Sequence, residues 1–193
     1  MKNLKTKDLI YSGTFAVLYM IVAMITSMIV GIVPFLSIYG YQVVVGIACS
    51  TIYFMFVMKL KKFGAITILA TLIGIMGAGS GHIFTLFLAF PIGLIADFVC
   101  KIGKYESKTM YNLSYIIFNL LSVTPTLTFI TAKDATIQLC IDYYGQDYGD
   151  AIELLITNYM LYVQIVLAII GGILGVIFAQ KMLKKHFSKV GMG

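Results

Sequence analysis

Charged residues are scarce in this sequence. Of its 193 residues, 11% are charged and 60% are hydrophobic, whereas about a quarter of the residues in a soluble domain are charged. A soluble fold of this length could not hide so much apolar surface. Several stretches also exceed the roughly 18 apolar residues that separate a membrane-spanning helix from a buried core helix. The composition therefore predicts an integral membrane protein with a single domain, residues 1–193, and it excludes a soluble enzyme module.

Motifs for catalysis, cofactors and metals are also lacking. The three cysteines, Cys49, Cys100 and Cys140, lie far apart and form no CxxC pair. There is no P-loop and no HExxH, and GAGSGH (77–82) does not fit the GxSxG pattern of serine hydrolases. Asp97 is the only acid well inside an apolar segment, and either an ion pair with Lys101 or a packing and capping role is expected for it. We therefore expect no enzyme activity, no cofactor and no metal.

Six apolar segments can be counted along the chain. They lack the period-two alternation of barrel strands, so membrane-spanning helices are predicted. The six predicted helices cover about residues 8–33, 42–58, 63–78, 83–100, 110–131 and 151–180. The expected fold is an all-α integral membrane protein with six transmembrane helices.

One long connection, residues 132–150, separates the fifth and sixth predicted helices. Thr131 and Asp134 fit a capping box and Gly145 fits a helix stop, so a short helix is predicted over 132–144. Asp150 and Glu153 form a second such pair, which predicts the start of the sixth helix. The connection is interpreted either as a lid over a pocket or as a solvated hairpin.

The lysines are distributed unevenly between the two ends of the predicted bundle. The chain has no arginine, and only Lys133 falls on the side where five of the eight acids also lie. Because cytoplasmic loops carry positive charge, both termini are predicted to be inside. The net charge of +6 thus reflects membrane topology rather than nucleic-acid binding. The thirteen lysines on the inner side are Lys2, Lys5, Lys7, Lys59, Lys61, Lys62, Lys101, Lys104, Lys108, Lys181, Lys184, Lys185 and Lys189.

Small residues recur at helical spacing in the first and sixth segments. In lipid, small residues let helix backbones approach closely. The stripe in the sixth segment predicts close packing inside the bundle. The stripe in the first segment is interpreted either as packing inside the bundle or as a docking surface for another membrane protein. The stripes are Ala168, Gly171, Gly175 and Ala179 in the sixth segment, and Ser12, Ala16, Ala23 and Ser27, extended by Gly31, in the first.

Polar side chains gather toward the outer side of the predicted bundle. Each alone has an ordinary structural explanation, such as a tyrosine in an interfacial belt. Their convergence at a similar inferred depth, on several elements, predicts a binding pocket for a small molecule. The candidate substrate-binding residues are Tyr39, Gln42, His82, Asn119, Thr126, Asn158, Tyr159 and Tyr162.

Several stretches resemble one family of bacterial membrane proteins. They are MKNLKTKDLIYSGTFAVLY at the start, KKFGAITILATLIGIMG, PIGLIADFV, and the basic motif QKMLKKHFSK near the end. Together with six hydrophobic helices, they are similar to the Trep_Strep family, which is regarded as a group of substrate-binding S components of energy-coupling factor (ECF) transporters. Such transporters import vitamins and other micronutrients.

The resemblance implies a six-helix S-component bundle in the bacterial cell membrane, with a binding site near the outer face. It also implies three partners: a transmembrane coupling protein and two ATPase subunits. S components dock through small residues of the first helix, and here Ser12-xxx-Ala16 and Ala23-xxx-Ser27 stand in place of AxxxA. The absent P-loop fits an importer that borrows its ATPase.

Other classes of function remain open from the residues alone. One alternative is a membrane scaffold or assembly protein without a small-molecule ligand. Another is a stand-alone secondary transporter driven by an ion gradient, and an intramembrane enzyme comes last.

Labelling of single cysteines tests the topology. A membrane-impermeant thiol reagent applied to intact cells should modify Asp147→Cys, because the acidic connection is predicted to be outside. The same reagent should not modify Lys104→Cys in the predicted inner loop. Modification of position 104 from outside would overturn the topology.

Overall fold

The chain folds into a bundle of helices. A computed structural model describes residues 4–184, and within that range no strand is present. The elements are α1 (Thr6–Val30), η1 (Leu36–Gly40), α2 (Tyr41–Ala48), α3 (Ser50–Leu60), α4 (Ala65–Gly79), α5 (Ile83–Ile102), α6 (Lys108–Asn119), η2 (Leu120–Val123), α7 (Thr124–Thr131), α8 (Lys133–Tyr144), α9 (Gln146–Leu155) and α10 (Met160–Met182).

Four helical stretches in this range are long and apolar enough to cross a membrane: α1, α5, α10, and Lys108–Thr131, which joins α6, η2 and α7. The pair formed by η1–α2 and α3, bent by 41°, makes a fifth if it counts as one span. The remaining predicted segment is α4, whose 15 residues extend about 22 Å, against a hydrocarbon core of about 30 Å. The chain is therefore an integral membrane protein with four or five candidate spans.

Two of the predicted helices are broken. The segment predicted over 42–58 begins earlier, in the single π-helical turn η1, and it bends at Cys49. The segment predicted over 110–131 tightens into the 3₁₀ turn η2 just before Pro125. Proline has no N–H, so the carbonyl of Leu121 loses its helical partner. The backbone N–H and the hydroxyl of Thr124 both donate to that carbonyl instead, which lets the chain continue as α7.

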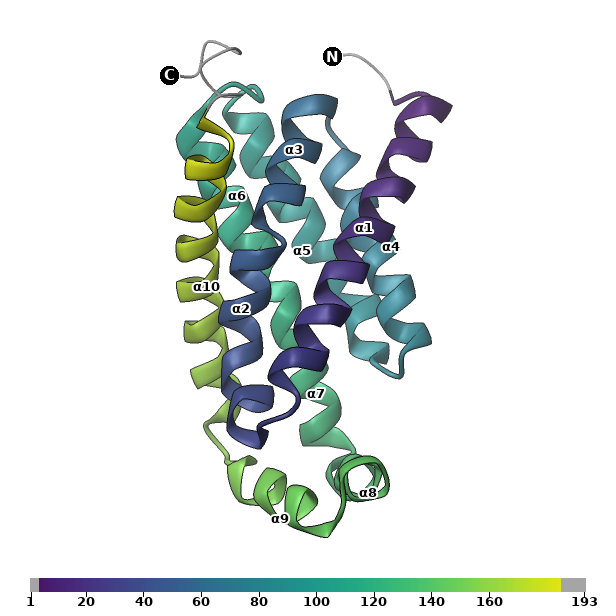
Figure 1. The fold of residues 1–193 in the computed structure, drawn as a ribbon. Helices are drawn as coiled ribbons and strands as arrows, with labels where there is room; N and C mark the ends of the chain where they lie inside the picture. The colour runs from purple at the N-terminus through teal and green to yellow at the C-terminus, as the bar shows by residue number, and fades with distance from the viewer. Residues whose placement is uncertain (1–3, 185–193) are drawn as a thin grey trace.

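The sixth predicted helix, over 151–180, is two helices instead. The chain runs through α9 across the end of the bundle and turns before α10 begins at Met160 (Figure 1). The capping prediction for Asp150 was wrong, because its carboxylate accepts from the amide of Gln146 inside α9. The capping prediction for Thr131 was also wrong, because its hydroxyl donates to the carbonyl of Leu127.

The helix stop predicted at Gly145 is present. Gly145 has a φ of 93°, in the left-handed region, and its N–H donates to the carbonyl of Ile141. Glycine adopts this conformation without steric cost, so α8 ends here and α9 can start in a new direction. Together α8 and α9 form a cap over one end of the bundle (Figure 1).

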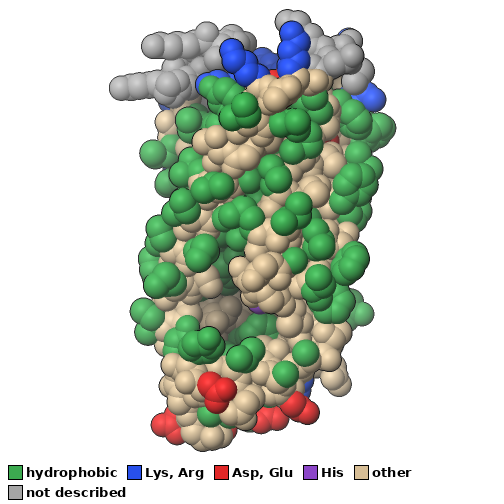
Figure 2. All heavy atoms as spheres, turned by 90° about the vertical axis from the view of Figure 1, so that its right-hand side faces the viewer, with side chains coloured by type: hydrophobic (Ala, Val, Ile, Leu, Met, Phe, Trp, Pro, Cys, Tyr) green, Lys and Arg blue, Asp and Glu red, His purple; other side chains and the backbone are tan. Residues whose placement is uncertain are grey.

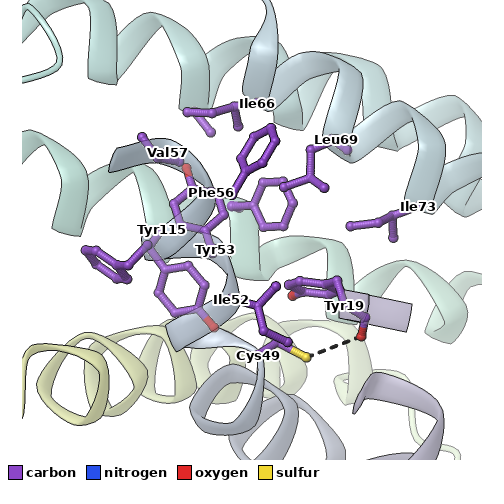
Figure 3. Close-up of a cluster of buried hydrophobic side chains, with 14 of the residues drawn as sticks. Tyr19, Cys49, Ile52, Tyr53, Phe56, Val57, Ile66, Leu69, Ile73 and Tyr115 are labelled. Atoms are coloured by element: carbon purple, nitrogen blue, oxygen red, sulfur yellow. Dashed lines mark hydrogen bonds between the residues drawn. The ribbon is translucent and has the colours of Figure 1, made fainter. Parts of the chain in front are cut away.

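The helices form a ring around α3. Going round, α1 contacts α4, α4 contacts α5, α5 contacts α6, α6 contacts α10, and α10 contacts α2, which contacts α1 again. The centre is aromatic: Tyr53 and Phe56 of α3 are fully buried, and Tyr53 packs on the rings of Tyr115 and Phe118 from α6 (Figure 3). The buried hydroxyl of Tyr53 is hydrogen-bonded to the hydroxyl of Ser114 at 2.6 Å, so it does not remain without a partner in the core.

Asp97 caps the start of α4 from the neighbouring helix α5. Its carboxylate accepts from the backbone N–H of Gly64 at 2.7 Å, from Thr67, and from the hydroxyl of Tyr105 at 2.6 Å. The capping interpretation of this buried acid is thus confirmed. The alternative ion pair with Lys101 is not formed, because the Lys101 ammonium lies over the ring of Phe63 at 4.5 Å from the centroid.

The small-residue stripe of α10 packs as predicted. All four residues of the stripe are buried. A Cβ atom at Gly171 would lie 2.8 Å from the Cα of Val43 in α2, and one at Gly175 would collide with the backbone carbonyl of Gly46. Only glycine lets the α2 and α10 backbones come this close.

Charge separates along the bundle axis. In Figure 2, lysine side chains gather at one end and acidic side chains at the opposite end, which α8 and α9 form. The described chain both begins and ends at the lysine-bearing end (Figure 1). Lys2, Lys185 and Lys189 lie outside the described residues. The uneven distribution inferred from the sequence is therefore present in three dimensions.

A pair of alanine substitutions tests the close contact between α2 and α10. Gly175→Ala should lower the free energy of unfolding by about 1–3 kcal/mol, because the added methyl group meets rigid backbone. Gly13→Ala in α1 is the matched control, since a Cβ there meets no atom within 4 Å. The control should be neutral or stabilising by up to about 1 kcal/mol. Thermal unfolding in detergent measures both, and equal stability of the two variants would contradict the contact.

Candidate functional site

A cavity of about 280 Å³ lies between α1 and the hairpin of α4 and α5. Its inner wall comes from α2, η2 and α7. On α1 it is lined by residues of the second half, and on α4 and α5 by residues near the turn that joins them. These segments all belong to the half of the bundle nearer the acidic cap, where Figure 2 shows a hollow with a histidine side chain beside it.

Methionines form half of the α1 wall. Met20, Met24 and Met28 are spaced four apart, so they lie on one face of the helix, and all three line the cavity. Met24 and Met28 are also largely exposed on the outer surface of the bundle. Methionine is flexible and polarisable, so this wall can adapt its shape to an occupant.

The turn between α4 and α5 positions His82 at the cavity. Gly81 has a φ of 90°, which reverses the chain. The N–H of His82 then donates to the carbonyl of Gly77, and its carbonyl accepts from the N–H of Thr85, so the backbone on both sides of the side chain is fixed. The imidazole Nδ1 is buried and has no hydrogen-bond partner among the described residues. His82 therefore lines the cavity with an imidazole whose Nδ1 is enclosed by the protein and unpaired.

Burial also sets the charge of His82. Desolvation lowers the pKa of this imidazole below its ordinary value of 6.5, because burial disfavours the charged form. At neutral pH the ring is therefore uncharged, and each of its two nitrogens is either a hydrogen-bond donor or an acceptor.

Some hydroxyls around the cavity are already paired within the protein. Thr85 and Thr124 share a hydrogen bond of 2.7 Å between their hydroxyl groups. The hydroxyl of Ser122 donates to the carbonyl of Asn119 at 2.7 Å. These pairs stabilise the wall itself. The polar groups left for an occupant are the imidazole of His82 and the hydroxyls of Tyr19, Ser27 and Tyr41. The volume lies near the lower end of the range of about 300–1,000 Å³ for small-molecule sites.

The eight predicted site residues do not converge on this cavity. His82 alone of them lines it. Gln42, Asn119 and Thr126 are buried in the core. The hydroxyl of Tyr39 donates to the carbonyl of Leu155, beneath the cap.

Three predicted residues lie near the turn between α9 and α10. Asn158, Tyr159 and Tyr162 are all exposed, and the tyrosines are 62% and 72% exposed. The predicted helix face shared by Asn158 and Tyr162 does not exist, because Asn158 precedes the start of α10.

The core residues belong to a network organised by Gln164, which the sequence reading missed. The carbonyl oxygen of Gln164 accepts from the amide of Gln42 at 2.8 Å and from the hydroxyl of Thr126. Its own amide donates to the carbonyl of Ile38 in η1 at 3.0 Å. Asn119 in turn donates to the carbonyl of Ala168 at 2.8 Å. These residues hold η1, α2, α6, α7 and α10 together rather than facing a ligand.

The sequence prediction did not select most of the cavity residues, because they are apolar or belong to no recognisable motif. The one signal in the sequence was the spacing of Met20, Met24 and Met28, which places three flexible side chains on one helix face. Tyr19 and Ser122 carried no such signal.

The small-residue stripe of α1 faces inward. Ser12, Ala16 and Ala23 are 0%, 1% and 7% exposed, and the Ser12 hydroxyl donates to the carbonyl of Asp8. Ser27 is exposed and lines the cavity. The packing interpretation of the first three residues is confirmed, and they are not accessible to a partner in this structure.

Comparison with known proteins gives one match. The model of a family described as hypothetical bacterial integral membrane protein (Trep_Strep) matches residues 6–189. No curated protein and no solved structure matches the chain.

The buried imidazole predicts a dependence of stability on pH. The unfolded chain binds the His82 proton more tightly than the folded chain does, so stability should fall as the pH drops below about 6.5. His82→Gln should flatten the curve of melting temperature against pH between about 7 and 5, while Ser80→Ala at the same turn should keep the wild-type slope. Equal slopes for wild type and His82→Gln would contradict a buried neutral imidazole.

Proposed function

We propose a transport function for this chain, which belongs to the Trep_Strep family of bacterial integral membrane proteins. In this proposal it is the substrate-binding S component of an ECF importer. It captures a small solute at the outer face of the cell membrane and delivers it inside with a coupling protein and two ATPases. The role is one of binding and delivery, without catalysis.

The observation that carries the proposal is the cavity beside His82. It combines a concave, mostly apolar lining with an unpartnered buried nitrogen, which is the composition expected of a small-molecule site. An unpartnered buried polar atom has an energetic cost that a bound solute would remove. A scaffold protein has no need of either feature.

The proposed orientation places the cavity in the outer half of the membrane. The lysine-bearing end should face the cytoplasm, because positive charge is retained on that side. The acidic cap then faces outward, and the chain crosses six times with α4 as a short crossing. In the labelling test proposed above, Cys140 should first be replaced by serine, because it is a half-buried thiol within the cap itself.

The cap formed by α8 and α9 is suited to act as a lid. The hydroxyl of Tyr148 in α9 donates to the carbonyl of Gly31, which follows the end of α1, at 2.6 Å. The hydroxyl of Tyr39 in η1 donates to the carbonyl of Leu155 at 2.9 Å. These two single hydrogen bonds join the cap to elements near the cavity. They support the lid interpretation over that of a solvated hairpin.

Because Ser12, Ala16 and Ala23 are buried in this structure, we propose that docking to the coupling protein uses another surface. The outward face of α1 remains exposed along its length, as at Leu18, Ile21 and Ile25. Such apolar side chains can face either lipid or a protein partner. Crosslinking from these positions to the coupling protein would identify the face that meets it.

A stand-alone secondary transporter is the second candidate. The broken pair α2–α3 and the break at η2 favour it, because discontinuous helices often line the sites of such transporters. Uptake that continues without ATPase partners and collapses with the ion gradient would favour this candidate over the importer.

Blocking the cavity mouth tests the proposed function. Protein purified from cells grown in rich medium should retain a small molecule that native mass spectrometry detects. Ser27→Phe should reduce its occupancy at least about tenfold, since the ring fills the entrance and the solute loses its contacts. Ile29→Phe, which adds a ring two residues away on the exposed side of α1, should retain it.

Two results would contradict the proposal. One is wild-type protein that holds no small molecule, and the other is equal retention in the two phenylalanine variants.

A further inference from the structure

The cavity has no charged lining. None of its sixteen lining residues is an aspartate, glutamate, lysine or arginine. The two buried carboxylates of the described bundle are engaged elsewhere. Asp8 is paired with Lys62 at 2.7 Å, and Asp97 is held by backbone and hydroxyl donors at the other end of α5. An ionised group in the cavity would therefore find no opposite charge, in surroundings where an unpaired charge is costly.

The wall is suited to a flat ring. Tyr19 and Tyr41 line the cavity together with the three methionines of α1. Thioether sulfur makes favourable contacts with aromatic edges, and aromatic rings stack or meet edge to face. Flexible methionines can close around a flat molecule without a rigid pocket of matching shape.

The polar groups of the lining carry no formal charge. The hydroxyls of Thr85 and Ser122 are engaged in the wall, whereas the imidazole of His82 and the hydroxyls of Tyr19, Ser27 and Tyr41 line the cavity without such a pair. A solute that fits this lining carries a hydrogen-bonding group at the end that meets His82, and an apolar body against the methionines of α1.

Building on the proposed transport function, we infer that the cavity binds an uncharged, ring-containing solute, hydrogen-bonded through one polar end to His82. Roughly one or two rings fit the volume. Solutes that carry a phosphate or carboxylate are excluded because no cation lines the cavity. An organic cation could use only the faces of Tyr19 and Tyr41, and such contacts are weaker than the cost of burying the charge without a carboxylate.

Three photoreactive probes that differ only in charge test the inference. They are 4-azidobenzamide, which is neutral, 4-azidobenzoate, which is anionic, and 4-azidobenzylamine, which is cationic. The protein in lipid nanodiscs is irradiated with each probe, and mass spectrometry quantifies adducts on residues 19–28. Labelling of the exposed positions Ile169, Ile170 and Ile173 of α10 corrects for probe dissolved in the lipid.

The amide should label residues 19–28 at least about tenfold more than either charged probe, after correction. Ser27→Phe should remove this labelling and Ile29→Phe should not. His82→Phe should reduce it several-fold, while His82→Gln should keep most of it, because glutamine still offers a hydrogen-bonding group.

The results separate this inference from the proposed function. Labelling by the benzoate or the benzylamine equal to that by the amide overturns the inference, as does amide labelling that never exceeds the lipid reference. A retained molecule that is ionised at pH 7 overturns the inference and leaves transport standing. Selective labelling by the amide in a protein that retains nothing from cells supports the cavity chemistry and counts against transport.

Discussion

The backbones of α2 and α10 are in close contact, and this contact fixes how the neighbouring helices are placed. Gly46 faces Gly171 and Gly175 with no side chain between them, and the amide of Asn119 reaches the carbonyls of both helices. With α2 fixed against α10, its other residues Tyr41 and Val45 are turned toward α1 and form the inner wall of the cavity. The cavity thus exists because the glycine contact draws α2 toward one side of the ring.

Features that follow from local sequence were predictable. The lysines indicated the charged ends because they recur in alternate predicted loops, and the spacing of Gly171 and Gly175 indicated the packed face because both lie in one helix. The break at η2 has a local cause in Pro125, which has no N–H. The bend at Cys49 and the turn before Met160 were not predictable, because they involve partners far away in sequence. The thiol of Cys49 contacts the carbonyl of Tyr19, and the carbonyl of Leu155 accepts from Tyr39 at a separation of 116 residues.

Of the predicted site residues, the structure brings His82 to the cavity and places the other seven elsewhere. The sequence prediction selected polar residues, because polar side chains are costly in lipid. In this bundle Gln42 and Thr126 satisfy their polarity by hydrogen bonding to Gln164, which also bonds to the carbonyl of Ile38. A ligand site needs a polar atom that has no such partner, and only the three-dimensional arrangement identifies it. Among the predicted site residues, His82 has such an atom and lines the cavity. Gln42 and Asn119 also carry an unpaired buried oxygen, but they lie in the core and do not line the cavity.

The first helix, α1, contacts three features: the cavity, the bend between α2 and α3, and the cap formed by α8 and α9. Tyr19 lines the cavity, and its carbonyl lies 3.7 Å from the thiol of Cys49, where α2 bends into α3 (Figure 3). Twelve residues later, the carbonyl of Gly31 accepts from Tyr148 of the cap. A solute that pushes on the methionine face of α1 therefore acts on one element that contacts the bend on one side and the cap at its end. Under the proposed transport function, filling the cavity and securing the cap would be coupled through the position of α1, which is largely exposed on its outward face and packs on the bundle through its small residues.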